Sequence, residues 1–350
     1  MGNKQKKKNK KERKKNQKIE SMLNGPNEKK QVKILILGTG ESGKSTFVKQ
    51  IHLIHKDGFD TKTRERFKIA IHFNLIKGLQ DLIEGLPLIR KNVQKSLSEV
   101  AQDFLQLNPR TGLTTTIIDA VESLWADESI KEMYEQRSLI QIPSSTNYFL
   151  DSLERISKND YLPNDNDIIM CRIPTTGINQ VQFEDQGLQW SLIDVGGQRS
   201  ERRKWIHHFD NVSIVFYVIA LDEYDQALYE NIEINRMTES LDLLSQTLGN
   251  QIFRKTPCFL IFNKFDLFQK KIKKVDLNVC FKKYKGGKNE QNALNFIYKT
   301  FKKAVSSKKR NINCFSSIGT ETDNVCQVLK QVQESVKRNS PHILSSLNQI

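Results

Sequence analysis

A glycine-rich run at residues 38–46 carries the clearest chemistry in this sequence. Gly38, Gly43, Lys44 and Ser45 match the phosphate-binding pattern G-x-x-x-x-G-K-[ST]. In such a loop the glycines let backbone N–H groups converge on phosphate oxygens. The lysine then reaches the outer phosphates, and the serine hydroxyl can bind Mg²⁺. The run therefore predicts a site for a nucleoside triphosphate.

The residues around this loop have the order that the pattern requires. Residues 32–37 form a short, mostly apolar run suited to a buried strand. After the loop, Phe47, Val48, Ile51 and Ile54 recur at helical spacing. Strand, loop and helix in this order disfavour the plainer alternative, a glycine-rich turn that binds no ligand.

A second candidate ends another apolar run, at residues 190–195. Asp194 stands where a carboxylate at a strand end could hold the Mg²⁺ shell opposite the phosphate loop. Gly196 and Gly197 would let the backbone swing towards a terminal phosphate, and Gln198 could orient an attacking water. An aspartate at a strand end is often only a turn residue, but its place after a phosphate loop favours the metal site.

A third candidate, Asn263-Lys264-Phe265-Asp266, ends the apolar run 258–263. The Asp266 carboxylate could accept hydrogen bonds from the N1–H and 2-amino groups of guanine. Adenine lacks both donors and would leave the carboxylate unpaired, which is costly in a closed site. Asn263 could bridge back to the phosphate loop, and the Lys264 stem could lie on the base. The motif therefore favours GTP over ATP.

The loop at residues 172–177 precedes the run that Asp194 ends. Arg172 could stabilise charge on the phosphates, and Thr175 could complete the Mg²⁺ shell beside Ser45. Alone these residues would be an ordinary loop, and their position between the other motifs favours the functional interpretation.

The hydrophobic pattern changes once along the chain. Residues 58–168 keep helical spacing without convincing alternation, which predicts an all-helical insert. From about residue 180, apolar strand-like runs alternate with helical segments, which predicts a parallel sheet covered on both faces with ligands at the carboxyl ends of its strands. The predicted strands are 32–37, 190–195, 212–220, 258–263 and 312–315, and the predicted helices include 232–248, 293–305 and 325–336.

The formal net charge of +15 is concentrated in two segments. Residues 1–18 carry a net charge of +9 and residues 270–310 carry +12, so the remainder is mildly acidic. This distribution argues against a general nucleic-acid-binding surface. The N-terminal run alone suits an anionic membrane surface or nucleic acid, and a solvated flexible arm with no partner is as good an interpretation as these two together. The five scattered cysteines and the absence of a secretory signal or membrane-length apolar run predict a cytosolic protein.

The motifs together resemble one family, the α subunits of heterotrimeric G proteins, in the form of its inhibitory class. The matching stretches stand in the family's order and spacing from about residue 32 to the end of the chain. They read GTGESGKST, RIPTTG, DVGGQRSERRKW and NKFD. The 125 residues between Thr46 and Arg172 separate this family from Ras-like GTPases that lack the long insert.

The resemblance implies an α/β fold, a Ras-like P-loop GTPase domain with a mostly parallel sheet plus an inserted all-α helical domain. A basic N-terminal arm would cover residues 1–30, the GTPase domain 31–57 and 169–350, and the helical domain 58–168. The nucleotide, GTP or GDP with Mg²⁺ as cofactor, would lie between the two domains.

The resemblance also implies roles for individual residues. Arg172 would act as a built-in arginine finger, able to pair with Glu41, and Gln198 would position water. Ser45 and Thr175 would bind Mg²⁺ directly, and Asp194 would do so through water. The implied nucleotide-binding residues are Glu41, Ser42, Gly43, Lys44, Ser45, Thr46, Ser145, Ile169, Arg172, Thr175, Asp194, Gly197, Asn263, Lys264, Asp266 and Gly319.

Two stretches depart from the family's pattern. The last guanine loop of the family reads Thr-Cys-Ala-Thr, and the aligned residues here are Ser317-Ile318-Gly319-Thr320. The Gly319 N–H could still meet the guanine oxygen, because that contact needs no side chain. Residues 144–145 are Ser-Ser where the family often has Asp-Ser, so only Ser145 matches.

At the N-terminus, Gly2 is available for myristoylation, although Lys6 stands where the consensus has Ser or Thr. One acyl chain binds membranes marginally, so the basic arm would supply a second signal. We expect the protein at the cytoplasmic face of the plasma membrane and in the cytosol.

The family also implies partners. These are a βγ dimer, a seven-helix receptor that takes the C-terminus, and regulators of G-protein signalling and effectors that contact the loops at 172–177 and 196–205. No nucleic-acid partner is expected.

The sequence therefore predicts a switch GTPase that transduces a receptor signal. One alternative is a nucleotide-stabilised binding module with negligible hydrolysis, which the intact Arg172 and Gln198 disfavour. Another is an ATP-using P-loop enzyme such as a kinase, which Asp266 disfavours.

Overall fold

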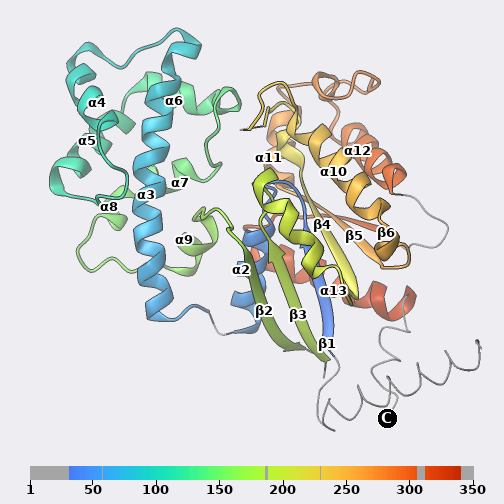
Figure 1. Cartoon of the computed structure of the whole chain (residues 1–350). Coiled ribbons are helices and arrows are strands. Elements are labelled where there is room, and N and C mark those ends of the chain that lie inside the picture. Colours follow the sequence, from blue (N-terminus) through green and yellow to red (C-terminus); the bar gives the residue numbers. More distant parts are fainter. Residues whose placement is uncertain (1–30, 57, 186–187, 229, 306–311, 340–350) are drawn as a thin grey trace, which may run out of the picture.

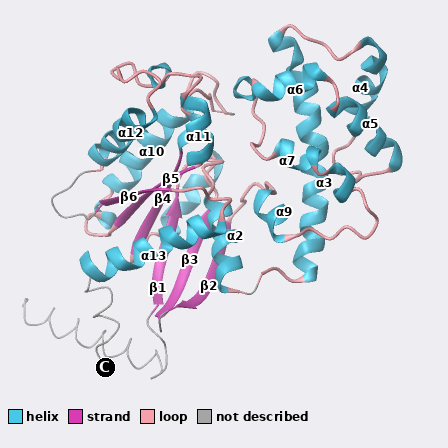
Figure 2. Cartoon of the chain, turned by 180° about the vertical axis from the view of Figure 1, so that it is seen from behind, coloured by secondary structure: helices cyan, strands magenta, loops and turns pink. Residues whose placement is uncertain are grey.

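A computed structural model describes residues 31–339 except 57, 186–187, 229 and 306–311. These residues form two bodies that lie side by side (Figures 1 and 2). One, here called the sheet body, contains a six-stranded sheet with α2 and α10–α13. The other, the helical body, contains α3–α8. Helix α9 (Asp165–Met170) lies between α3 and α2 and contacts both.

The sheet has the order β2-β3-β1-β4-β5-β6, with every neighbouring pair parallel except β2–β3. From β1 the chain first forms β2 and β3 on one side of this strand, and then forms β4, β5 and β6 on its other side. The direction in which strands are added therefore reverses beside β1. In such sheets ligands bind at the carboxyl ends of the strands next to this reversal. The strands are β1 Gln31–Leu37, β2 Ile178–Asp185, β3 Leu188–Val195, β4 Ile214–Ala220, β5 Cys258–Asn263 and β6 Ile312–Ser316.

Alternate residues of the central strands enter two different cores, one on each face of the sheet. In β1, Ile34 and Ile36 pack with α2 and α13, whereas Leu35 and Leu37 pack with α10, α11 and α12. Because both faces are covered, these strands are apolar throughout, as parallel strands usually are. The covering helices are α2 Lys44–His55, α10 Arg236–Gly249, α11 Phe265–Ile272, α12 Glu290–Ala304 and α13 Thr322–Asn339.

The helical body is arranged around α3, a helix of 25 residues whose N-terminus is capped by Asp60. Side chains from α3–α8 share a separate apolar core that includes Leu75, Leu79 and Phe149. No strand lies between α2 and β2 among the residues described there. The helices are α3 Thr61–Gly85, α4 Ser98–Leu105, α5 Thr115–Trp125, α6 Glu128–Glu135, α7 Thr146–Asp151 and α8 Leu153–Ile156.

The predicted fold class is confirmed, and each predicted strand is present with shifts of up to two residues at its ends. The helix predicted from residue 232 is wrong at its start, because α10 begins at Arg236. Asn235 caps that helix by accepting hydrogen bonds from the N–H groups of Met237 and Thr238. The predicted domain boundary after residue 168 falls inside α9, and the domain division itself stays a prediction.

Strand β2 was not predicted. It is an antiparallel edge strand whose sequence, INQVQFED, has only three apolar residues. Among the described residues, no helix has the length and apolar character needed to cross a membrane, and all five cysteines are free thiols. The predictions for the N-terminal arm with Gly2, and for the C-terminal tail, fall outside the described residues.

Candidate functional site

A cavity of about 250 Å³ lies between the two bodies, at the carboxyl ends of β1, β3 and β5. Its floor is the loop between β1 and α2, and its helical side includes residues 143–145. The sheet reversal beside β1 therefore coincides with the predicted phosphate loop, as expected for a parallel α/β sheet.

The phosphate loop has backbone φ angles that glycine adopts more easily than other residues. Gly38 and Gly43 have φ values of 144° and 96°. A Cβ at Gly43 would lie 2.0 Å from the Asn263 side-chain nitrogen, so this position must be glycine. Helix α2 begins at Lys44 without a side-chain cap, which leaves its first N–H groups available to an anion.

The Lys44 ammonium is buried beneath this loop. It donates to the carbonyls of Gly38 and Thr39 at 3.0 and 2.7 Å. Burial lowers the pKa of Lys44 to about 8, against the opposing attraction of Asp194. A Cβ at Gly197 would lie 2.4 Å from the Lys44 nitrogen, so a side chain at Gly197 would displace the ammonium. An anionic ligand would complete the charge balance of this lysine.

Three oxygen-bearing side chains meet beside Lys44. The Ser45 hydroxyl lies 2.6 Å from the Thr175 hydroxyl and donates to Asp194 Oδ2 at 2.7 Å. Burial raises the pKa of Asp194, and its Oδ1 atom is buried without a hydrogen-bond partner in the described part of the chain. Two hydroxyls and a carboxylate with an unused oxygen fit Mg²⁺, which usually takes one or two carboxylates together with phosphate and water.

The other end of the cavity carries the predicted base-reading residues. Asn263 donates to the Ser42 carbonyl at 3.0 Å and accepts from the Gly319 N–H at 2.8 Å. The Gly319 N–H, predicted to meet guanine, is thus bonded to Asn263 in this structure. Asp266 lines the cavity at the first turn of α11, and its carboxylate makes no hydrogen bond or ion pair with the described residues.

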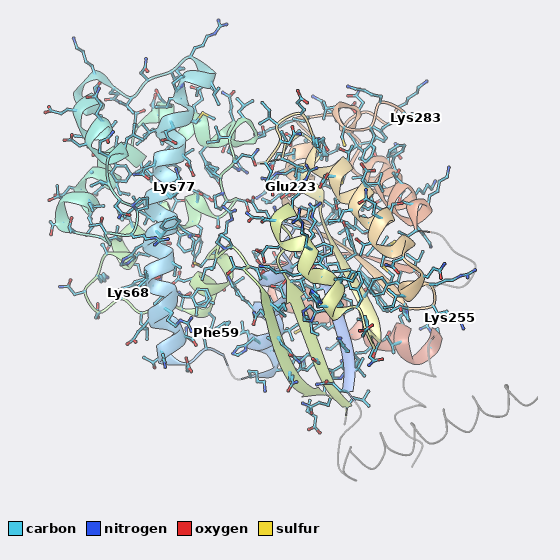
Figure 3. All side chains as sticks on the ribbon, viewed as in Figure 1. Phe59, Lys68, Lys77, Glu223, Lys255 and Lys283 are labelled. Atoms are coloured by element: carbon cyan, nitrogen blue, oxygen red, sulfur yellow. The ribbon has the colours of Figure 1, made fainter. Side chains whose placement is uncertain are left out.

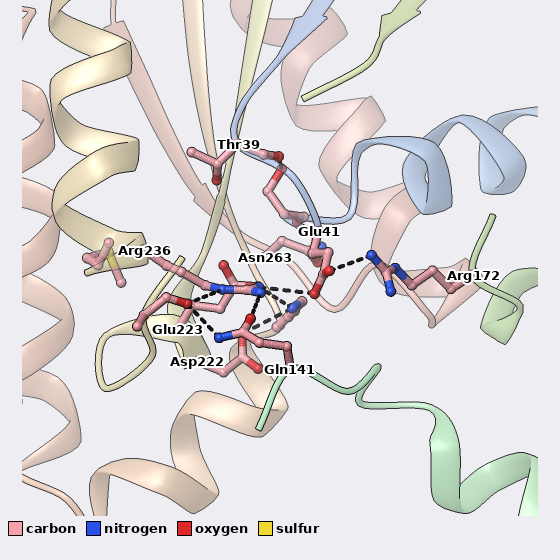
Figure 4. Close-up of polar contacts among 12 residues, drawn as sticks. Thr39, Glu41, Gln141, Arg172, Asp222, Glu223, Arg236 and Asn263 are labelled. Carbon is pink, nitrogen blue, oxygen red and sulfur yellow. Dashed lines mark hydrogen bonds and ion pairs between the residues drawn. The ribbon is translucent and has the colours of Figure 1, made fainter. Parts of the chain in front are cut away.

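The predicted pair between Arg172 and Glu41 is present, with 2.6 Å between Arg172 Nη2 and Glu41 Oε1 (Figure 4). The other Glu41 oxygen accepts from Arg236 at 3.0 Å. Arg236 also pairs with Glu223 at 3.3 Å and donates a hydrogen bond to Gln141 of the helical body. Burial opposes the ionisation of Glu41, but the two arginines outweigh it and lower the pKa of this carboxyl.

Sequence reasoning missed most of this charged cluster. Arg236, Glu223 and Gln141 belong to segments without any motif, and only the fold brings them to Glu41. Lys264 joins the same cluster through Glu223 at 2.8 Å and Asp222 at 3.4 Å. Both carboxylates follow β4 directly, at a strand end, and this position was the one available signal.

Gln198 lies at the edge of the cavity against the phosphate loop. A Cβ built at Gly40 would be 3.5 Å from Gln198 Cγ, so the two segments are in contact distance. The following 3₁₀ helix, Arg199–His208, is fixed to the sheet body. Arg199 and Arg202 pair with Glu239 of α10 at 2.7 and 2.6 Å, and the Trp205 indole donates to the Gly196 carbonyl at 2.8 Å.

Most of the predicted site residues line this one cavity. They are Glu41, Gly43, Lys44, Ser45, Thr46, Ser145, Ile169, Arg172, Thr175, Gly197, Gln198, Asn263, Lys264, Asp266 and Gly319. Ser42 and Asp194 do not line it. Ser42 is buried and donates to the Thr39 carbonyl at 3.0 Å, and Asp194 lies behind Ser45. Gly2 falls outside the described residues.

Comparison with known proteins agrees with the family resemblance of the motifs. A family model described as "G-protein alpha subunit" matches residues 5–336. The guanine nucleotide-binding protein alpha-17 subunit of Caenorhabditis elegans is 37% identical over 345 residues, which cover 96% of this chain and 97% of that protein. The G(o) subunit alpha of Lymnaea stagnalis is 36% identical over 316 residues, 89% of each chain. The alpha-7 subunit of Caenorhabditis elegans is 39% identical over 303 residues, 85% of this chain and 86% of that protein.

The lowered pKa of Lys44 predicts proton uptake when a diphosphate binds. Phosphate oxygens stabilise the ammonium, and near pH 8 the phosphate itself is already ionised. Binding of GDP should therefore take up protons, and the uptake should increase as the pH rises through about 8. Calorimetry in buffers of different ionisation enthalpy measures this uptake. In Lys44→Arg, whose guanidinium does not titrate, the uptake should vanish, and equal uptake in both proteins would contradict the prediction.

Proposed function

The chain belongs to the family of G-protein alpha subunits, and on that premise we propose that it binds GTP and GDP with Mg²⁺ and slowly hydrolyses GTP as a signalling switch. One observation carries the proposal. Lys44, Gln198 and Asp266 follow three different strands and still line a single cavity. Lys44 suits the phosphates, Gln198 beside the phosphate loop suits the attacking water, and Asp266 at the other end of the cavity suits the guanine.

The magnesium ligands in this proposal are Ser45 and Thr175, with Asp194 behind them. When bound, Mg²⁺ would neutralise negative charge on the phosphates. The unused Oδ1 of Asp194 supports this assignment. Burial raises the pKa of this carboxyl, and a cation beside it would favour the ionised form again.

Hydrolysis would depend on positioning and charge stabilisation rather than on covalent chemistry. Gln198 orients the water for in-line attack on the terminal phosphate. Arg172 stabilises the charge that develops there, the role that the family resemblance assigns to it. Its guanidinium pairs with Glu41 through Nη2 here, and a guanidinium has further N–H donors that would contact phosphate oxygens during the reaction.

Members of this family work with βγ dimers and receptors in general, and we assign the same classes of partner to this chain. The loops at 172–177 and 196–205 border the cavity and would change when the terminal phosphate leaves. Regulators and effectors would bind these two loops and distinguish their two conformations. Gly2 and the basic arm would attach the protein to an anionic membrane surface, which sedimentation with anionic vesicles tests.

Replacing Gln198 by Leu should remove most of the hydrolysis without removing GTP binding. The apolar side chain cannot orient water, and positioning losses of this kind cost about 100-fold in rate. Phosphate release in a single turnover from GTP-loaded protein measures the effect. The exposed Gln246→Leu on α10 is the matched control and should hydrolyse at the unaltered rate. Negligible phosphate release from the unaltered protein would favour the rival, a nucleotide-stabilised binding module, and equal, measurable rates in the Gln198 variant and the unaltered protein would contradict the role given to Gln198.

Replacing Asp266 by Asn should change the base that the site prefers. The NH₂ group of the new asparagine is a donor and would face the N1–H and amino donors of guanine. Xanthine has an oxygen in place of the amino group and can accept from that NH₂. Competition against labelled GTP should show guanine losing about 100-fold or more relative to xanthine nucleotides. The exposed Asp242→Asn should keep the preference for guanine. A shift towards ATP in either protein would instead support a kinase-like site.

The partners should depend on the bound nucleotide. Immobilised protein loaded with GDP should capture a βγ dimer, and protein loaded with a non-hydrolysable GTP analogue should release it. A Cβ at Gly197 would collide with Lys44 and with the Thr39 carbonyl at 2.6 Å, so Gly197→Ala should keep the dimer under both conditions. Gly249→Ala, with nothing within 4 Å of the added methyl, should behave like the unaltered protein. Nucleotide-independent capture by the unaltered protein would contradict the switch.

A further inference from the structure

Arg172 lies just after α9, where the chain has no regular structure to hold it. Helix α9 ends at Met170, the N–H of its cap residue Cys171 donates to the Asp167 carbonyl at 2.9 Å, and β2 begins only at Ile178. The Arg172 backbone is held instead by a side chain of the helical body. Its N–H donates to Asn74 Oδ1 at 2.8 Å, and its carbonyl accepts from Asn74 Nδ2 at 2.9 Å.

We propose that Asn74 is a positioning residue for GTP hydrolysis, which acts by fixing the backbone of Arg172. This inference rests on the function proposed above. One amide engages both backbone groups of a single residue, as a neighbouring strand would, and no other described residue bonds to either group. The two bonds therefore restrict both the position of Arg172 and the direction in which its side chain leaves the backbone.

Asn74 stands on α3, the longest helix of the helical body. Its neighbours Leu75 and Ile76 are fully buried, and Gly78, one turn later, lies against Thr146 of α7. Figure 3 labels Lys68 and Lys77, which precede and follow Asn74 on the same long helix. An amide on such an element can fix a partner within the small tolerance that catalysis requires.

Arg172 is therefore held from both bodies at once. Asn74 of α3 holds its backbone, and Glu41 of the phosphate loop holds its guanidinium at 2.6 Å. From the sheet body, Lys49 of α2 donates to the carbonyls of Ile168 and Cys171 at 3.0 and 2.6 Å, which fixes the end of α9 directly before Arg172. A displacement of α3 away from the phosphate loop would carry the Arg172 backbone with it.

The test compares single-turnover hydrolysis of GTP in four proteins, which are the unaltered chain, Asn74→Ala, Arg172→Ala and the double variant. We expect Asn74→Ala to lose about 10-fold in rate, within the range that misplacing a catalytic group costs. In the Arg172→Ala background the same substitution should change the rate less than about twofold, because no guanidinium is left to position. An equal loss in both backgrounds would show a merely structural role and would overturn the proposal.

Asn74→Asp and Asn159→Ala complete the design. The aspartate keeps an acceptor for the Arg172 N–H but sets a carboxylate oxygen against the Arg172 carbonyl, so it should also be slow while preserving the size of the side chain. Asn159 is exposed in the helical side and its side chain makes no described hydrogen bond, so its variant should keep the full rate. Full activity of Asn74→Asp and of Asn74→Ala would overturn the proposal.

Amide hydrogen exchange at Arg172 separates failure of this inference from failure of the proposed function. Exchange should accelerate in Asn74→Ala and stay unaltered in Asn159→Ala, with GDP bound throughout. If the unaltered chain hydrolyses no GTP, the proposed function fails, and the role of Asn74 in hydrolysis fails with it. If the unaltered chain is active and exchange at Arg172 does not respond to Asn74→Ala, only the positioning inference fails.

Discussion

The buried Lys44 ammonium is the charge on which this arrangement depends. Two carbonyls of its own loop hold it, and burial nevertheless lowers its pKa to about 8. A lysine in that state attracts an anion, and the uncapped first turn of α2 points its N–H groups in the same direction. The glycines at 38, 43 and 197 serve this geometry, since a side chain at any of them would collide with a neighbouring atom. The phosphate loop is thus organised around a charge that it cannot balance alone.

Charge balance also explains the cluster that joins the two bodies. Three carboxylates, Glu41, Asp222 and Glu223, face three cations, Arg172, Arg236 and Lys264. Removing one member of such a set would leave a partner buried and uncompensated, which costs more than the pair contributes. The cluster therefore favours one relative position of the phosphate loop, the segment after β4 and the helical residue Gln141.

The sequence predicted the parts of this site that local patterns determine. Lys44 and Asp266 each come after an apolar run and Asp194 stands near the end of one, and the parallel sheet brings the ends of such runs together. Residues that act through long-range packing had no such signal. Asn74 and Gln141 lie in the helical insert, where periodicity reports only which face is buried. Strand β2 was missed because an edge strand with polar residues lacks the apolar pattern, and α10 was started too early because Asn235, a cap, stands inside an otherwise helical spacing.

Asn263 couples the two ends of the cavity that the motifs describe separately. Its amide donates to the Ser42 carbonyl in the phosphate loop, and its oxygen accepts from the Gly319 N–H in the loop after β6. Gln50 of α2 makes a second link to the loop after β6. It donates to the Gly319 carbonyl at 3.2 Å and accepts from the Thr322 hydroxyl at 2.9 Å. Because Thr322 is the first residue of α13, a displacement of that helix would pull on the base end and the phosphate end together. Under the proposed function, base reading and phosphate binding would therefore be coupled through these hydrogen bonds, although the sequence encodes the two segments more than 200 residues apart.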